Sequence, residues 1–308
     1  MEFTYYRLAR SAPGYRWWKP IVTGLIALGI FIGFTIVLVV LLLVSTLVIP
    51  EVRPAITKLI TTGTIDNSLP VILAFSLSSI AVILPSVLLA RLAMGPRPVG
   101  LLWSIAGRMR WRWMARLMLP VVIAYGVSTL FSVVLLPLLT GERIPSAAVS
   151  STTWIVVIVA VLLVPLQATA EEIFFRGYLA QTIGGWLKHP LFAILLPVPL
   201  FTIGHQYDVW GLIDVSVFAV VAGWLAWRTG GLEASIVAHV VNNTVIFVIG
   251  AFGLVDVNSK TGSGLEVVIS ALTLALYSWL VLRAAKRFGL VRVRVFAPPL
   301  PLLLPQAP

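Results

Sequence analysis

Residues 21–49 read IVTGLIALGIFIGFTIVLVVLLLVSTLVI, a run without a single charged side chain. This run is longer than the ~20 residues that a helix needs to cross a lipid bilayer. A basic stretch, 1–20, precedes it, and the run is too long for the core of a cleaved signal peptide, which has about 7 to 15 residues. We therefore predict a retained first membrane helix.

Similar apolar runs recur along the 308 residues, of which 59% are hydrophobic and 11% charged. This composition excludes a water-soluble globular protein, because a soluble domain carries about 25% charged residues. Taking about 20 apolar residues per span, we predict an all-α fold, a polytopic membrane helical bundle with about eight transmembrane helices. The expected spans are 21–49, 69–90, 117–139, 153–176, 190–207, 210–227, 234–254 and 266–282.

The charges of the chain fit a membrane topology. Its 22 Lys and Arg residues outnumber its 11 Asp and Glu residues, for a net charge of +11. Most of the basic residues lie beside apolar runs, on one side of the eight-span topology, so the positive-inside rule explains them better than nucleic-acid binding and predicts both termini in the cytoplasm. The chain has no cysteine, which excludes disulfides, thiolate metal sites and a cysteine nucleophile.

The pattern predicts one membrane domain with distinct parts and no internal repeat. Three membrane helices lie in 21–140, with a basic, Trp-containing loop at 91–116 whose composition suits an interfacial helix. The other parts are a basic cytoplasmic N-terminus (1–20), a helical core that holds polar residues (153–254), a last membrane helix (266–282) and a cytoplasmic tail that is basic and then proline-rich (283–308).

Three of the predicted spans carry polar residues. A charge near the centre of a span costs roughly 2.5 to 3.5 kcal/mol on insertion scales, so such residues mark functional sites. Glu172 and Arg176 are four residues apart and can form an ion pair on one helix face. Glu171 lies about 100° around the helix from Glu172, which leaves its carboxylate free for chemistry.

The remaining polar residues fit hydrolysis. Glu171 could take a proton from water while His205 orients that water for attack on a carbonyl. His239 and Asn243, four residues apart on one face, could donate hydrogen bonds to the resulting oxyanion. Alternatively, Glu171, His205 and His239 could hold a divalent metal such as zinc, which would activate water directly.

These segments resemble the signature of the CAAX protease and bacteriocin-processing family of intramembrane peptidases, which includes the Rce1-type prenyl proteases. The family pattern Glu-Glu-x-x-x-Arg, Phe-x-x-x-His and His-x-x-x-Asn is matched at 171–176, 201–205 and 239–243. The similarity covers about 154–248. It identifies 153–254 as the catalytic core of such a protease.

The resemblance also implies roles for the matched residues. Glu171 and His205 would activate water, His239 and Asn243 would form the oxyanion hole, and Glu172 with Arg176 would support the site. The family has been described both as glutamate proteases and as metalloproteases. We favour the glutamate form, with a divalent metal as the alternative.

We therefore expect an intramembrane endopeptidase in a bacterial cytoplasmic membrane. Its partners would be the lipid bilayer and a peptide or protein substrate in or at the membrane, either CAAX-like or a bacteriocin or leader peptide, and not nucleic acid. Two other functions use the same residues: a proton-coupled transporter with a Glu, His and Arg relay, and a non-catalytic scaffold or bacteriocin immunity factor. The halves of the chain show no repeat symmetry, which many transporters have.

The depths of the two histidines conflict in this scheme. Counting from the cytoplasmic ends of straight spans places His239 in the inner half of the membrane and His205 in the outer half. Pro197 and Pro199 are therefore expected to break or tilt the fifth span and bring His205 back toward the centre. Because Glu171 lies nearer the inner end of its span, we expect the polar cavity to open toward the cytoplasm.

Two polar residues have no assigned role. Asp214 falls within the sixth predicted span, near the outer interface or in the cavity. Gln167 lies one turn before Glu171, where a hydrogen bond between packed helices is the expected use of its amide.

Overall fold

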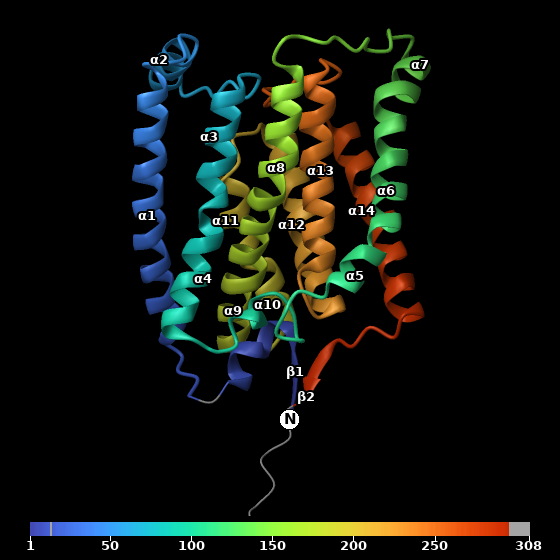
Figure 1. The fold of residues 1–308 in the computed structure, drawn as a ribbon. Coiled ribbons are helices and arrows are strands. Elements are labelled where there is room, and N and C mark those ends of the chain that lie inside the picture. Colours follow the sequence, from blue (N-terminus) through green and yellow to red (C-terminus); the bar gives the residue numbers. More distant parts are fainter. Residues whose placement is uncertain (13, 296–308) are drawn as a thin grey trace, which may run out of the picture.

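The computed structural model describes residues 1–12 and 14–295, and helices make up most of this part of the chain (Figure 1). Seven helices or helix runs within it are long and apolar enough to cross a membrane. Leu25, Leu119 and Leu162 on their outer faces are 63%, 69% and 64% exposed. Such faces need lipid around them, so the chain is an integral membrane protein and the predicted all-α bundle is confirmed.

The seven runs occupy most of the chain. They are α1 (Lys19–Ser45), α3 and α4 (Pro70–Ala81, Ile83–Met94), α5 to α7 (Trp111–Arg116, Met118–Leu130, Leu136–Thr140, with the π-helical η3 at Phe131–Leu135), α8 to α9 (Thr153–Glu172, Ala180–Trp186, with the π-helical η4 at Ile173–Leu179), α12 (Val209–Thr229), α13 (Glu233–Ala251) and α14 (Gly264–Arg287). A separate helix, α2 (Val52–Thr62), lies beyond the end of α1 (Figure 1).

The predicted fifth span is short and broken. It consists of α10 (Pro190–Leu195) and α11 (Pro197–Ile203) and ends four residues before the predicted end at 207. Pro197 starts the second piece, where its missing N–H and fixed φ suit a first helical turn but not a helix interior. The break expected from Pro197 and Pro199 is thus present, and residues 204–208 form a loop that carries His205.

Both ends of the described chain lie on the same face of the bundle. Strand β1 (Glu2–Thr4) pairs antiparallel with β2 (Val293–Val295), below the helices in Figure 1. This pairing agrees with the even number of passes that the sequence predicts. The proline-rich part of the predicted tail, 296–308, lies outside the described residues.

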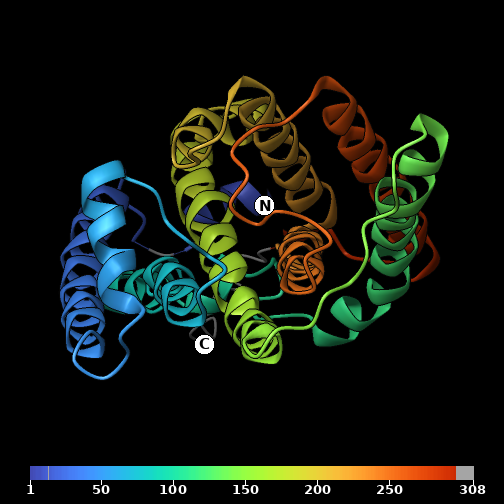
Figure 2. The ribbon, with the colours of Figure 1, turned by 90° about the horizontal axis from the view of Figure 1, so that it is seen from above.

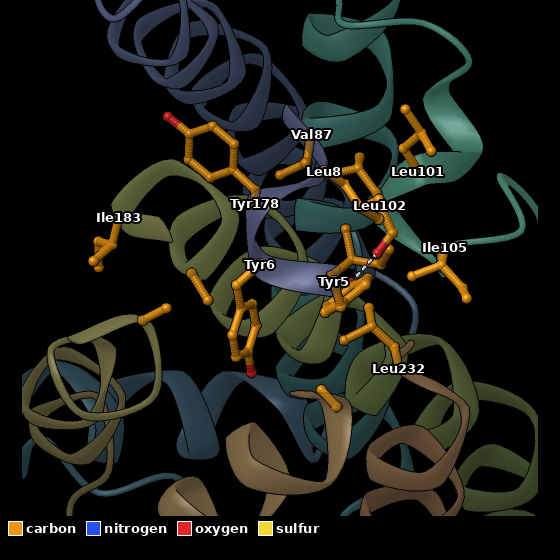
Figure 3. Packing of buried hydrophobic residues seen from close by; sticks show 14 of the residues in the cluster. Tyr5, Tyr6, Leu8, Val87, Leu101, Leu102, Ile105, Tyr178, Ile183 and Leu232 are labelled. Atoms are coloured by element: carbon orange, nitrogen blue, oxygen red, sulfur yellow. Dashed lines mark hydrogen bonds between the residues drawn. The ribbon is translucent and has the colours of Figure 1, made fainter. Parts of the chain in front are cut away.

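The N-terminal segment packs into the protein core. Its 3-10 helix η1 (Tyr5–Ser11) buries Tyr5, Tyr6 and Leu8 almost completely, as Figure 3 shows. The Tyr5 hydroxyl donates to the carbonyl of Leu102, and the Tyr6 hydroxyl donates to that of Gly223 at 2.6 Å. The segment therefore closes the bundle beneath α9 and α12, which its basic composition alone did not indicate.

The segment 91–116 does not form the single interfacial helix that its composition suited. After α4 the chain makes a short 3-10 helix, η2 (Val99–Leu102), and a loop before α5. The loop pairs with the turn between α12 and α13, since Ile105 donates to the Gly230 carbonyl at 2.9 Å and Leu232 donates to that of Trp103 at 2.8 Å. Prolines at 96 and 98 prevent one continuous helix here.

Helix α8 occupies the middle of the bundle and packs against α3 on one side and α13 on the other. In the view from above, α1 to α4 gather on one side of α8, while α6 and α12 to α14 lie on the other (Figure 2). The residues singled out from the sequence lie on α8, η4, α13 and the loop after α11, so the packing of α8 against α13 decides which of them meet.

Candidate active site

The predicted ion pair is present and fully buried. Nη1 of Arg176 donates to Oε1 of Glu172 at 2.9 Å, and Glu172 is 0% exposed. The Arg176 guanidinium also lies 4.2 Å from the centre of the Phe201 ring, which faces the cation with its π electrons. The pair thus neutralises two charges that the membrane interior would otherwise disfavour.

His239 joins this ion pair to Glu171. Its Nδ1 lies 2.9 Å from Oε1 of Glu172, and its Nε2 lies 3.2 Å from Oε2 of Glu171. Each ring nitrogen that carries a proton can donate a hydrogen bond to the carboxylate that it faces. With an imidazolium, the two carboxylates balance two cations, and the cluster of Glu171, Glu172, Arg176 and His239 has no net charge.

A second connection links Glu171 to α13 through amide side chains. Nε2 of Gln167 donates to Oε2 of Glu171 at 2.8 Å, and Nδ2 of Asn243 donates to Oε1 of Gln167 at 3.2 Å. Asn243, in turn, accepts at Oδ1 from Nδ2 of Asn242 at 3.1 Å. Gln167 therefore bridges the carboxylate to Asn243, a contact that its position four residues before Glu171 could have indicated.

His205 lies in the loop after α11 and makes no hydrogen bond or ion pair with Glu171 within the described structure. Its Nδ1 lies 2.8 Å from the backbone oxygen of Phe201, and its ring lies 4.8 Å from the Phe201 ring, centre to centre. Phe201 also approaches His239, with ring centres 6.3 Å apart. Because a carbonyl can only accept, Nδ1 of His205 carries the proton and Nε2 is left as an acceptor.

A cavity of about 480 Å³ adjoins these residues. His205, His239 and Asn243 line one part of it, and α6, α12 and α14 supply much of the remainder. The lining continues into the loop between α13 and α14, on the face opposite the two strands (Figure 1). The lining therefore extends to the face opposite the termini, whereas the sequence, which places both termini in the cytoplasm, predicts an opening on the cytoplasmic face.

Asp214 lines this cavity, which is one of the two positions that the sequence allowed for it. Its Oδ1 atom is buried and makes no hydrogen bond within the described part of the protein. Phe218, one turn further along α12, packs against His239 with ring centres 4.9 Å apart. The sequence offered no signal for this contact, because Phe218 is one apolar residue among many in its span.

The donors proposed for a metal do not converge. Both ring nitrogens of His239 already face carboxylate oxygens, those of Glu171 and Glu172, so neither is left for a metal. Among the residues that the structure describes, no group of three His, Asp or Glu side chains could hold a metal ion. The expected set of Glu171, His205 and His239 therefore does not fit the three protein ligands that catalytic zinc requires.

Comparisons with known proteins concern this same region. Residues 150–245 match the family model described as "Type II CAAX prenyl endopeptidase Rce1-like". The chain is also 40% identical over 91 residues to "Uncharacterized protein YyaK" of Bacillus subtilis (strain 168), a stretch that spans 27% of this chain and 30% of that relative. No solved structure matches the chain. The part of this membrane protein that is similar to the Rce1-like family, residues 150–245, thus holds all six predicted site residues.

Proposed function

We propose that the protein is an intramembrane endopeptidase that hydrolyses a peptide bond in a membrane-associated protein. The observation that carries this proposal is the buried cluster of two carboxylates, an imidazole and a guanidinium beside a cavity of about 480 Å³. Buried charges in a membrane protein are costly and are kept where function needs them. The family match over 150–245 supports the same class of activity.

Glu171 is the proposed general base. Its Oε2 is held by Gln167 and lies beside His239, while Oε1 makes no hydrogen bond within the described residues. Oε1 would take a proton from water as the water oxygen attacks the substrate carbonyl. The unprotonated Nε2 of His205, at the cavity wall, would accept a hydrogen bond from the same water and orient it.

His239 and Asn243 are the proposed donors to the oxyanion. Nδ2 of Asn243 has a second N–H besides the one given to Gln167. The Nε2–H of His239 is held near Glu171 by charge, and this attraction weakens when Glu171 becomes neutral by taking the water proton. The same proton transfer would thus release His239 toward the developing oxyanion.

The second half of the reaction returns the proton. When the tetrahedral intermediate collapses, the C–N bond breaks and the leaving nitrogen takes the proton from Glu171, which restores the carboxylate. Glu172 and Arg176 would hold His239 in position throughout, since both are buried and paired. No step is assigned to a metal, because the donor set does not fit one.

Cleavage by the purified protein tests this proposal. Two fluorogenic substrates are compared in detergent, a prenylated Cys-a-a-X peptide and a bacteriocin-type leader peptide, each with and without a strong chelator. We expect cleavage of at least one peptide that resists the chelator and falls on the order of 10² to 10⁴-fold in Glu171→Gln. Glu142→Gln, at an exposed loop position, serves as the control and should keep full activity.

Two outcomes would overturn the proposal. One is unchanged cleavage by Glu171→Gln, which would assign the reaction to other groups. The other is ion or solute flux in proteoliposomes that Glu171→Gln abolishes while neither peptide is cut, which would identify a carrier.

A further inference from the structure

Gln167 connects the two functional ends of the proposed site. It lies on α8, one turn before Glu171, and is only 4% exposed. Its amide nitrogen donates to Oε2 of Glu171 at 2.8 Å, and its amide oxygen accepts from Nδ2 of Asn243 at 3.2 Å. A single side chain thus contacts both the proposed base and a proposed oxyanion donor, on two different helices.

The charge of Glu171 fixes the orientation of this connection. An ionised carboxylate only accepts hydrogen bonds, so Gln167 must present its nitrogen to Glu171 and its oxygen to α13. Asn243 must then present Nδ2 to Gln167, and its own oxygen is turned toward Asn242, which donates to it at 3.1 Å. The side chains form one directed chain of hydrogen bonds that ends on the carboxylate.

Burial makes this orientation matter. Asn243 lines the cavity, so either its nitrogen or its oxygen faces a bound carbonyl. If the carboxamide turned over, a partly negative oxygen would face the developing oxyanion and would raise its energy. With Gln167 in place the nitrogen is fixed, and its second N–H remains for the substrate.

We propose, on the basis of the proposed function, that Gln167 is a positioning residue that couples the charge of Glu171 to the donor orientation of Asn243. It touches neither water nor substrate in this scheme. Its loss would therefore weaken transition-state stabilisation more than substrate binding, because the oxyanion exists only after attack.

A pair of glutamine variants tests the coupling. Gln167→Met keeps the side-chain length and removes both hydrogen bonds. Gln181→Met is the matched control, since Gln181 is 1% exposed on the continuation of the same helix and donates to the Leu101 carbonyl at 2.7 Å, away from the site. We expect Gln167→Met to lower kcat roughly tenfold to a hundredfold with little change in KM, and Gln181→Met to leave both unchanged.

A charged variant separates positioning from packing. In Gln167→Glu the new carboxylate repels Glu171 and cannot donate to it, whereas its protonated form can donate to Glu171 and accept from Asn243. The kcat of Gln167→Glu should therefore rise toward the wild-type value as the pH falls. A purely structural role for Gln167 would not produce this pH-dependent recovery.

An infrared titration tests the coupling without any substrate. The protonated carboxyl band that Glu171→Gln removes identifies Glu171 in pH-difference spectra. In Gln167→Met the frequency of this band should shift, because the carboxyl of Glu171 loses its hydrogen bond to Gln167. An unshifted band overturns the coupling even if no peptide is cut, while normal kcat and pH profiles in both Gln167 variants overturn it with the protease function intact.

Discussion

Arg110 and Glu233 anchor the start of the helix that carries His239 and Asn243. Glu233 is the first residue of α13 and is 0% exposed. Its Oε1 accepts from the backbone N–H and the Nε of Arg110 at 3.0 and 2.8 Å, and its Oε2 accepts from Nη2 at 2.6 Å. Arg110 also donates to the Thr229 carbonyl at the end of α12, so the pair joins three segments.

Breaking this pair should destabilise the protein strongly. Removal of one partner of a buried ion pair costs about 3 to 5 kcal/mol, because the other charge stays buried and unpaired. Glu233→Gln leaves the Arg110 side chain, which is 14% exposed, so water can partly solvate the unpaired charge and we expect a loss of about 3 kcal/mol of unfolding free energy. Arg110→Met leaves the fully buried Glu233 unpaired, so we expect a loss of about 5 kcal/mol.

A double-mutant cycle measures the interaction itself. Unfolding in mixed SDS micelles can be followed by the fluorescence of the chain's 11 Trp residues. The double variant should lose about 2 kcal/mol less than the two single losses add up to, because it leaves no unpaired charge. Arg143→Met, in an exposed loop, is the control and should change the free energy by less than about 0.5 kcal/mol. Single losses below about 1 kcal/mol, or strict additivity, would refute the anchoring role.

Two further predictions concern the packing of η1 against Gly184 and the loop that Asp208 stabilises. Gly184→Ala would bring a Cβ into a clash with the Tyr6 carbonyl oxygen and should cost about 1 to 3 kcal/mol by displacing η1. Gly126→Ala, with open space around it, should be neutral or slightly stabilising in the same unfolding assay. Hydrogen bonds from the backbone N–H groups of Gly211 and Gly262 lower the pKa of the Asp208 carboxyl. The ionised carboxylate therefore stabilises the folded loop above about pH 4, and this stabilisation is lost as the pH falls through the folded-state pKa. The Gly262 amide should therefore lose protection from hydrogen exchange, corrected for intrinsic rates, below about pH 4. Asp208→Ala should show the same loss of protection at pH 6. Equal protection of this amide in the wild-type protein and in Asp208→Ala at pH 6 would contradict this prediction.

The parts of the fold predictable from sequence are those that depend on short-range pattern. Apolar runs of about 20 residues form helices in lipid whatever their neighbours are, because the backbone has no other way to satisfy its hydrogen bonds there. The break before Pro197 and the pairing of Glu172 with Arg176 are equally local, since each depends on residues within one helical turn. These features are present in the structure.

The parts that could not be predicted depend on contacts between distant residues. The Tyr6 hydroxyl reaches Gly223, and the loop around Ile105 pairs with Gly230. Nothing in the periodicity of either segment specifies these partners, so the sequence predicts only a basic cytoplasmic N-terminus and a basic interfacial loop. The direction of the cavity is also a tertiary property, because helices from both halves of the chain line it.

The meeting of both glutamates at His239 explains why adjacent carboxylates can occupy one helix here. Side chains at neighbouring positions point about 100° apart, so a single helix offers Glu171 and Glu172 no common cation. An imidazole from α13 has a nitrogen on each side of its ring and can face both, at 3.2 and 2.9 Å. Each charge in the cluster then depends on the others, and deleting one leaves a buried group unpaired. Loss of cleavage in a Glu172 or Arg176 variant must therefore be compared with its unfolding free energy before either residue is given a role in the reaction.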